Sequence, residues 1–165
     1  MPLSEPSFAD RAARRYVGIK ATVTIPFGPT LDRLFPEIFG WVGGHGLTPS
    51  GAPFVRYHDT SDMVNGIDIE VGVPVEGAAA GDERVSASEI PAGRYLVAVH
   101  TGRYDGLQES TRAFLDWGKR NGVVWAQDAA GRWLGRVETY LTNPAEQPDE
   151  ARWETELAFL TEWRG

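Results

Sequence analysis

The stretch YVGIKATVTI, residues 16–25, alternates apolar and polar side chains over most of its length. An alternation of period two is typical of a strand that has one face in the protein core and the other in water. The same kind of pattern returns seventy-six residues later in YLVAVHT, residues 95–101. The sequence therefore predicts two strands that open two related halves of the chain.

Further positions match at the same offset, and they extend the repeat beyond the two strands. The matched pairs are Leu31 and Leu107, Ile38 and Phe114, Phe39 and Leu115, Trp41 and Trp117, and Gly46 and Gly122. Beyond Gly122 the offset grows, because residues 126–133 are interpreted as an insertion with a turn at 128–131. The strand at 54–58 then matches 136–141, which makes Tyr57 the partner of Tyr140, and 67–73 matches 153–159. Each half is predicted to run strand, helix, strand, strand.

The second predicted helix has clear end signals. Asp105 can cap its start with Gln108 as a capping-box partner, and Asn121-Gly122 supplies a left-handed stop. The first helix has two interpretations, because Pro36 falls inside its apolar pattern. Either Pro36 opens the helix as its first residue, or it kinks a longer helix that begins at Thr30. We favour the first interpretation.

These elements predict an α+β fold. Two strand–helix–strand–strand units would form one antiparallel sheet, with both helices on one face and a central ligand groove between them at the pseudo-twofold axis. Residues 1–15 are predicted to be an N-terminal arm without strong structure of its own. Residues 16–165 are predicted to be one domain whose two repeats, 16–75 and 92–160, are joined by a loose linker at 76–91.

The composition is that of a globular protein and excludes several functional classes. Of 165 residues, 42% are hydrophobic and 24% are charged. The chain has no cysteine, so it has no disulfide and no thiolate chemistry, which fits a reducing cytoplasm. No apolar run is long enough to cross a membrane. The net charge of −7, with scattered arginines and only two lysines, argues against direct nucleic-acid binding.

Motifs for metals, cofactors and nucleophilic catalysis are missing from the sequence. The histidines, His45, His58 and His100, have no metal-ligand spacing, so we expect no metal. There is no GxSxG motif and no phosphate-binding glycine loop, so we expect no cofactor. His100 is more simply a surface or hydrogen-bonded residue than a catalyst. Asp68 and Glu70 alternate with isoleucines and valines, so they are interpreted as the water-facing side of a strand.

Several segments together resemble the gyrase-inhibitor-like (GyrI-like) family of small-molecule-binding domains. They are IPAGRYLVAVHTGRYDGL (90–107), AFLDWGKRNG (113–122) and ETYLTNP (138–144) in the second half, and PFVRYHD (53–59) and DIEVGVPV (68–75) in the first. The resemblance covers roughly residues 16–160. It implies the duplicated fold and a cleft for aromatic or cationic compounds, with a buried glutamate on the penultimate strand, which is Glu138 here.

The resemblance also implies two kinds of activity. Such domains serve as effector domains of drug-sensing transcription activators, which carry a helix-turn-helix ahead of the domain. Too few residues precede the domain here for one, so we expect no DNA contact. Some members of the family are implied to be hydrolases that open strained cyclopropane rings of DNA-alkylating natural products.

The strand at 136–141 holds the leading candidate residues. Period two puts Glu138 and Tyr140 on one face. Glu138 is either a solvent-facing carboxylate paired with Arg136 or Arg56, or a ligand-binding group, and the resemblance favours the second interpretation. Tyr57 could hydrogen-bond a ligand or could tie down the sheet.

Four other aromatic residues complete the predicted ligand-binding set. Trp153 would lie across from the glutamate strand if the last two strands form a hairpin, although core packing is the slightly favoured role for it. Phe39 and Phe114 are expected to be core residues with one edge on the groove. Tyr104 belongs to the segment 90–107 that carries the resemblance.

Three functions are therefore under consideration. The leading one is a module that sequesters or senses a hydrophobic, aromatic or cationic small molecule. The second is a hydrolase of an electrophilic aromatic compound, in which Glu138 activates or steers water. The third is a protein-binding inhibitor, but the acidic charge is spread out and indicates no protein partner.

Overall fold

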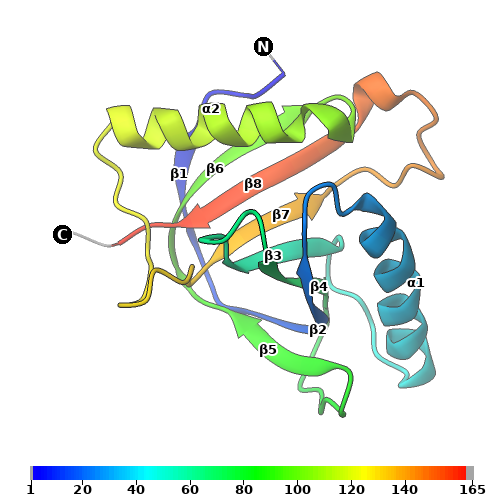
Figure 1. The fold of residues 1–165 in the computed structure, drawn as a ribbon. Coiled ribbons are helices and arrows are strands. Elements are labelled where there is room, and N and C mark those ends of the chain that lie inside the picture. The colour runs from blue at the N-terminus through cyan, green and yellow to red at the C-terminus, as the bar shows by residue number, and fades with distance from the viewer. Residues whose placement is uncertain (1, 163–165) are drawn as a thin grey trace.

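The computed structural model describes residues 2–162, and its frame is one antiparallel sheet of eight strands with two α-helices (Figure 1). The strands are β1 (Ser7–Arg11), β2 (Arg14–Val23), β3 (Phe54–Asp59), β4 (Ile67–Pro74), β5 (Ser86–Ile90), β6 (Gly93–Thr101), β7 (Arg136–Tyr140) and β8 (Glu154–Leu160). The helices are α1 (Gly28–Gly44) and α2 (Leu107–Arg120), and the 3-10 turns are η1 (Tyr104–Gly106) and η2 (Glu150–Arg152). Neither α-helix of this part of the chain has the length and apolar character that crossing a membrane requires.

The predicted duplication is visible in the order of the strands, which is β1-β6-β8-β7-β3-β4-β2-β5. The two units are β2-α1-β3-β4 and β6-α2-β7-β8. In each unit the last strand, β4 or β8, lies between the other two strands of that unit, and the two units meet where β3 pairs with β7. A pseudo-twofold axis therefore passes between β3 and β7. This order confirms the predicted α+β fold with a duplicated unit.

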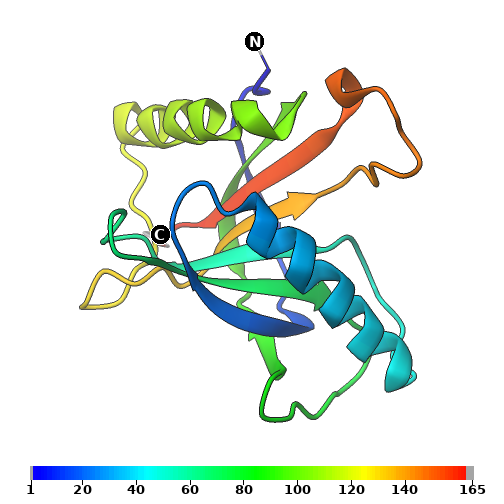
Figure 2. The ribbon, with the colours of Figure 1, turned by 45° about the vertical axis from the view of Figure 1, so that its right-hand side comes forward.

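Both helices cover the same face of the sheet (Figure 2). Ile38 and its neighbours one turn away on α1 are buried against the strands of the first half. Phe114 on α2 is buried against the second half, where its ring meets Phe159 edge-on. Removing a side chain of this size from water contributes about 2 kcal/mol. These two cores hold the helices on either side of the β3–β7 junction.

The opposite face of the sheet is also covered. Tyr16, Phe54, Ile90 and Tyr95 are buried there in one cluster. Ile90 belongs to β5 and Tyr95 to β6, which stand near opposite ends of the strand order. Their packing together means that the sheet curls until its two ends approach each other.

The two outer strands are not predicted by the sequence. β1 lies in the segment read as an arm, and β5 lies in the segment read as a loose linker. β1 precedes the first unit in the chain and pairs with β6, the first strand of the second unit. β5 precedes the second unit and pairs with β2, the first strand of the first unit. Their sequences, SFADR and SASEI, have no apolar alternation. Short polar strands are common at sheet edges, and pattern analysis misses them for that reason.

The first strands of the two halves match at a different offset from the predicted one. Val17 packs with α1, and its structural equivalent is Leu96, which packs with α2 seventy-nine residues later. Tyr16 and Tyr95 are likewise equivalent, each facing the other side of the sheet. The offset of seventy-six holds only in the helices, because α1 has 17 residues and α2 has 14.

The ends of the helices confirm the offset of seventy-six. Gly46 and Gly122 follow the two helices with φ values of +66° and +70°. The Trp41 indole N–H donates to Asp82 at 2.9 Å, and the Trp117 indole N–H donates to Glu5 at 3.2 Å. These carboxylates lie shortly before β5 and β1, so each tryptophan links its helix to an outer strand.

Two predictions about the helix starts are wrong. α1 runs from Gly28 to Gly44 with Pro36 in its interior, so Pro36 does not open the helix. The loss of one backbone hydrogen bond at Pro36 is offset by burial of Leu34 and Ile38 on either side of it. α2 begins at Leu107 and has no side-chain cap, because Asp105 lies in the preceding 3-10 turn.

Candidate functional site

Glu138 lies at the centre of the molecule, on β7 at the junction of the two halves. It pairs with Val55 of β3 on one side and with Leu157 of β8 on the other. Period two points Arg136, Glu138 and Tyr140 to the face that carries the helices. Glu138 is 6% exposed, so its carboxyl group sits in a largely dry environment. The alternative of a solvent-facing carboxylate is therefore excluded.

Two tyrosines bind the same oxygen of this carboxyl group. The Tyr140 hydroxyl donates to Glu138 Oε2 at 2.6 Å, and the Tyr57 hydroxyl donates to the same oxygen at 3.2 Å. The other oxygen, Oε1, accepts no hydrogen bond from residues 2–162. The carboxyl group is thus held in a fixed orientation and keeps acceptor capacity for a further donor.

Burial controls the protonation of these groups. Burial raises the pKa of Glu138, and the two tyrosine hydrogen bonds and the charge of Arg136 offset only part of that effect. Burial, with the negative charge of Glu138, also raises the pKa of Tyr57 and of Tyr140 well above its ordinary value. The phenols therefore remain protonated donors at neutral pH.

Arg136 is a second charged group on the same face. Its guanidinium carbon lies 4.8 Å from the ring centre of Tyr57, 4.8 Å from that of Trp133 and 4.7 Å from that of Phe159. We call these three rings the arginine cage. The Arg136 Nε is buried without a hydrogen-bond partner, and burial lowers the pKa of the guanidinium. Arg136 forms no ion pair with Glu138 in the described residues, so neither charge is directly neutralised.

Two aromatic rings from different elements contact Tyr140, and a third ring packs against one of them. Phe35 of α1 meets the Tyr140 ring edge-on with the ring centres 5.8 Å apart. Tyr104 of η1 contacts Tyr140 at 5.6 Å and Trp153 at 4.8 Å. Tyr104 is 37% exposed and is the outermost of these rings. A ligand that reaches the carboxylate has to displace some of these rings.

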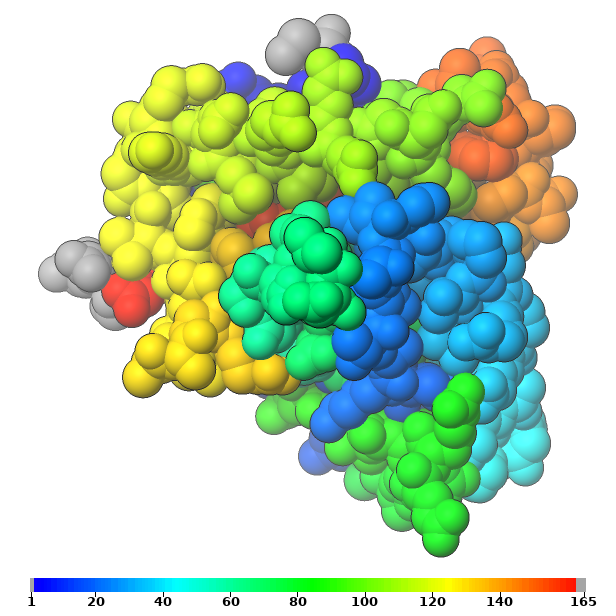
Figure 3. All heavy atoms as spheres, in the orientation of Figure 1, coloured from blue at the N-terminus to red at the C-terminus, as the bar shows by residue number. Residues whose placement is uncertain are grey.

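The space-filling view shows this side of the molecule from outside. The blue segment that leads into α1 and the turquoise loop at 60–66 lie in front of the sheet, close to α2 (Figure 3). In this view the segment that leads into α1 and the loop between β3 and β4 stand over the sheet face that carries the helices.

The structure brings five of the seven predicted ligand-binding residues together: Glu138, Tyr57, Tyr140, Tyr104 and Trp153. Phe114 has no edge on this site, because it is fully buried between α2 and the sheet. Phe39 is not a core residue, because it is 41% exposed on α1. Phe35, one turn earlier, is the α1 ring that contacts Tyr140.

Sequence reasoning missed Arg136 and Trp133 as parts of this site. The sequence indicates a place for Arg136 in the site, because period two puts it on the same strand face as Glu138 and Tyr140. Trp133 had none, since it belongs to the insertion at 126–133 and reaches the site only through the fold. Its backbone N–H donates to His58 O at 2.8 Å, which places the insertion against the end of β3.

His100 has the structural role that the sequence favours. It is 2% exposed, and its Nδ1 lies 2.7 Å from Ser110 Oγ while its Nε2 lies 2.9 Å from the Arg103 carbonyl oxygen. Nδ1 therefore joins β6 to α2, and Nε2 joins β6 to the residue that precedes η1. The described residues contain no group of three or more acidic or histidine side chains that could hold a metal ion.

The environment of Glu70 differs from the water-facing position that the sequence predicts. Asp68 is partly exposed as predicted, but Glu70 is 1% exposed and lies inside the curl of the sheet. The Tyr16 hydroxyl donates to Glu70 Oε1 at 2.6 Å, and His58 Nε2 lies 3.0 Å from the same oxygen. The sequence pattern alone suggests a wet face, because it does not reveal that the sheet curls and covers its second side.

A model of one protein family matches nearly the whole chain. It is described as the GyrI-like small molecule binding domain, and it matches residues 4–160. No curated protein matches the chain in sequence.

Solved structures with a similar fold include two of EcmrR. Its C-terminal domain has a TM-score of 0.83 and 20% identity, over 97% of this chain and 98% of that one. In the EcmrR–DNA complex the TM-score is 0.83 and the identity 21%, over 99% of this chain and 59% of that one. The chain thus spans about three fifths of the length of EcmrR in that complex.

Two other similar structures are more distant. SAV2435 bound to tetraphenylphosphonium has a TM-score of 0.62 and 11% identity, over 96% of this chain and 94% of that one. A hydrolase from Listeria innocua has a TM-score of 0.58 and 10% identity, over 96% of this chain and 92% of that one. At these identities the likeness shows a shared fold.

Proposed function

The chain belongs to the family of GyrI-like small-molecule-binding domains, and we propose that it binds an aromatic, cationic small molecule at Glu138, between its two halves. Binding there serves to sense or sequester the compound. EcmrR, whose C-terminal domain has the same fold, forms a complex with DNA, which supports a sensing role in a regulator.

The observation that carries the proposal is the state of the Glu138 carboxylate. It is buried, one oxygen is bound by Tyr57 and Tyr140, and the other has no partner among residues 2–162. Burying a carboxylate is costly, and the two tyrosine hydrogen bonds to Oε2 offset only part of that cost, because within the described residues Oε1 has no donor and no cation lies against the group. A ligand cation would recover that cost through an ion pair or a charge-assisted hydrogen bond.

The rings around the carboxylate favour the same class of ligand. Tyr104, Tyr140 and Trp153 present apolar faces that attract cations as well as aromatic groups. SAV2435 has been solved with tetraphenylphosphonium, a cation that carries four phenyl groups. That compound is therefore a suitable first probe for this domain.

Titration with a cation and a neutral analogue tests the proposal. Tetraphenylphosphonium and triphenylphosphine oxide are added separately, and binding is followed by calorimetry and tryptophan fluorescence. Glu138→Gln keeps the shape and removes the charge, so it should weaken cation binding by about ten- to a hundredfold and leave the neutral compound almost unchanged. Glu109→Gln, an exposed change on α2, is the matched control. Equal loss for both compounds, or no loss in Glu138→Gln, contradicts the proposal.

A second candidate function is hydrolysis of strained cyclopropane rings in DNA-alkylating natural products. It is supported by the raised pKa and the unpartnered oxygen of Glu138, which suit a general base. In this reaction Glu138 takes a proton from water as the water oxygen attacks a ring carbon. The electrons of the broken ring bond pass to the conjugated carbonyl oxygen of the substrate, which is then protonated. A hydrolase from Listeria innocua shares the fold.

Turnover distinguishes the two functions. An enzyme consumes more than one equivalent of a cyclopropane-containing substrate per protein, and Glu138→Gln would lower its rate by about 10²–10⁴-fold while leaving binding nearly intact. A binding module would show saturation without consumption.

A further inference from the structure

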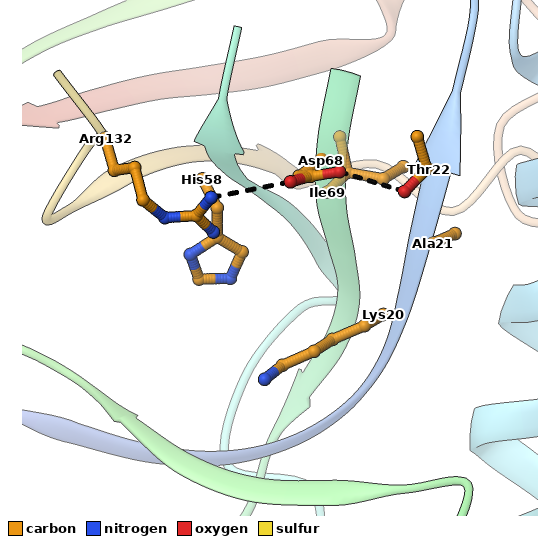
Figure 4. A pocket seen from close by; sticks show the side chains of 7 residues that line it. All are labelled: Lys20, Ala21, Thr22, His58, Asp68, Ile69 and Arg132. Carbon is orange, nitrogen blue, oxygen red and sulfur yellow. Dashed lines mark hydrogen bonds and ion pairs between the residues drawn. The ribbon is translucent and has the colours of Figure 1, made fainter. Parts of the chain in front are cut away.

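A hollow of about 370 Å³ lies on the side of the sheet opposite to Glu138. Figure 4 shows the side chains that line it. Its floor is formed by β2 and β4, and His58 of β3 and Arg132 of the 126–133 insertion stand at its wall. Lys20, Thr22 and Asp68 complete its polar lining. A hollow of this size is in the range of small-molecule sites.

His58 is held in the hollow by a buried carboxylate. Its Nε2 lies 3.0 Å from Glu70 Oε1. Burial raises the pKa of Glu70, but hydrogen bonds from His58 and Tyr16 outweigh that effect and leave the pKa below its ordinary value. An ionised carboxylate only accepts hydrogen bonds, so Nε2 carries the proton and donates. The other ring nitrogen, Nδ1, has no partner in residues 2–162 and remains available to a ligand.

Two cationic side chains point toward the same space as His58 (Figure 4). Lys20 has no hydrogen bond or ion pair within residues 2–162. Arg132 reaches Asp68 at 3.5 Å and Asp59 at 3.7 Å, which are long contacts that leave most of its five N–H groups unused.

The acidic groups near the hollow already have closer partners. Asp68 accepts a hydrogen bond from the Thr22 hydroxyl at 2.9 Å, and Asp59 accepts one from the Ser61 hydroxyl at 2.6 Å. Glu70 Oε1 is bound by Tyr16 and His58, whereas Glu70 Oε2 has no hydrogen-bond partner among residues 2–162 but is buried against Gly18. The hollow therefore has unused donors on Lys20 and Arg132, while each of the two carboxylates that approach Arg132, Asp59 and Asp68, already accepts a closer hydrogen bond.

From this imbalance of donors and acceptors we propose that the hollow is a second binding site, which takes the carboxylate or phosphate group of a small molecule. Lys20 and Arg132 supply charge-assisted hydrogen bonds to the anion, and His58 Nδ1, which carries no proton, accepts a hydrogen bond from a hydroxyl group of the ligand, such as the P–OH of a hydrogen phosphate. The site lies across the sheet from Glu138, so it does not depend on ligand binding there.

The test uses the full chain and two simple anions, inorganic phosphate and acetate, at constant ionic strength set with chloride. Amide resonances of Lys20, His58 and Arg132 should shift with saturation for at least one of the two anions, and the comparison identifies the preferred group. Lys20→Gln and Arg132→Gln should each raise the dissociation constant about tenfold. The control is Lys119→Gln, on the exposed last turn of α2 and outside the residues that line the hollow. This variant should leave the dissociation constant unchanged.

Circular dichroism and thermal melting of each variant confirm that it is folded before binding is compared. The titration is repeated with tetraphenylphosphonium present, and the anion shifts should persist. Shifts that grow linearly without saturation, or an affinity that Lys20→Gln and Lys119→Gln alter equally, would overturn the proposal. A failed cation titration at Glu138 has no bearing on this result, since the two sites use different residues.

Discussion

Val55 and Glu138 lie directly opposite each other on β3 and β7, and they hold equivalent places in the two halves. Val55 pairs with Val71 on β4, as Glu138 pairs with Leu157 on β8. The duplicated frame thus carries an apolar side chain in one half and a carboxyl group in the other. The symmetric frame therefore holds an asymmetric site, and this pair of positions is one place where the two halves differ.

The burial of Glu138 predicts a specific dependence of stability on pH. Its pKa is raised in the folded state, so the folded protein holds the proton more tightly than the unfolded chain. The stability that this gives is present below the unfolded pKa, and it is lost as the pH rises through the folded pKa. Without ligand, Glu138→Gln should therefore be more stable than the native protein at pH 7 and lose that advantage at pH 4. Urea unfolding at both pH values measures this, and a gap that does not change with pH would contradict it.

The two phenols that bind Glu138 should lower the pKa of its carboxyl group. Tyr140→Phe and Tyr57→Phe each remove one hydrogen bond to the ionised form, so each should raise the pKa of Glu138. The effect should be larger for Tyr140, whose bond is 2.6 Å long, than for Tyr57, whose bond is 3.2 Å. The ¹³C resonance of the carboxyl carbon reports the titration. An unchanged midpoint in both variants would mean that these contacts do not control the charge.

Two aromatic residues should separate stability from binding. Phe114→Ala removes a fully buried ring from the core under α2 and should cost about 3–5 kcal/mol of unfolding free energy. Tyr104→Ala removes a partly exposed ring over the site, so it should cost little stability and weaken tetraphenylphosphonium binding. Urea unfolding and calorimetric titration give the two quantities. If Phe114→Ala stays folded and lowers the affinity more than Tyr104→Ala, the position assigned to the site is wrong.

The repeat could be predicted from the sequence because its strongest markers lie in the helices. Trp41 and Trp117, with the glycines that follow each helix, keep one offset in sequence and in structure. The strand offset could not be fixed in this way, because α1 is one turn longer than α2. Alternation alone fits either face of a strand, and so Leu96 was not identified as the equivalent of Val17.

The polar part of the molecule was harder to predict because it depends on contacts between distant segments. Period two places Glu138 and Tyr140 on one face, and the structure agrees. The same rule gives the wrong environment for Glu70, since curling of the sheet buries a face that alternation marks as wet. Trp133 reaches the site from an insertion, and no local pattern indicates where an insertion will pack.

The final prediction concerns Arg136, whose positive charge lies on the same face as Glu138. If the site takes cations, this charge opposes the ligand, and Arg136→Met should remove the repulsion while retaining an apolar side chain in the arginine cage. The affinity for tetraphenylphosphonium should then rise several-fold, on the order of 1 kcal/mol, while triphenylphosphine oxide binds as before. Arg112→Met, an exposed change on α2, corrects for the loss of one positive charge from the molecule.

If Arg136→Met instead weakens the binding of the cation, the guanidinium supports the shape of the site. If the variant weakens only the neutral ligand, whose phosphoryl oxygen can accept a hydrogen bond, Arg136 is a donor to ligands, and the preference of the site is for acceptors and not for cations.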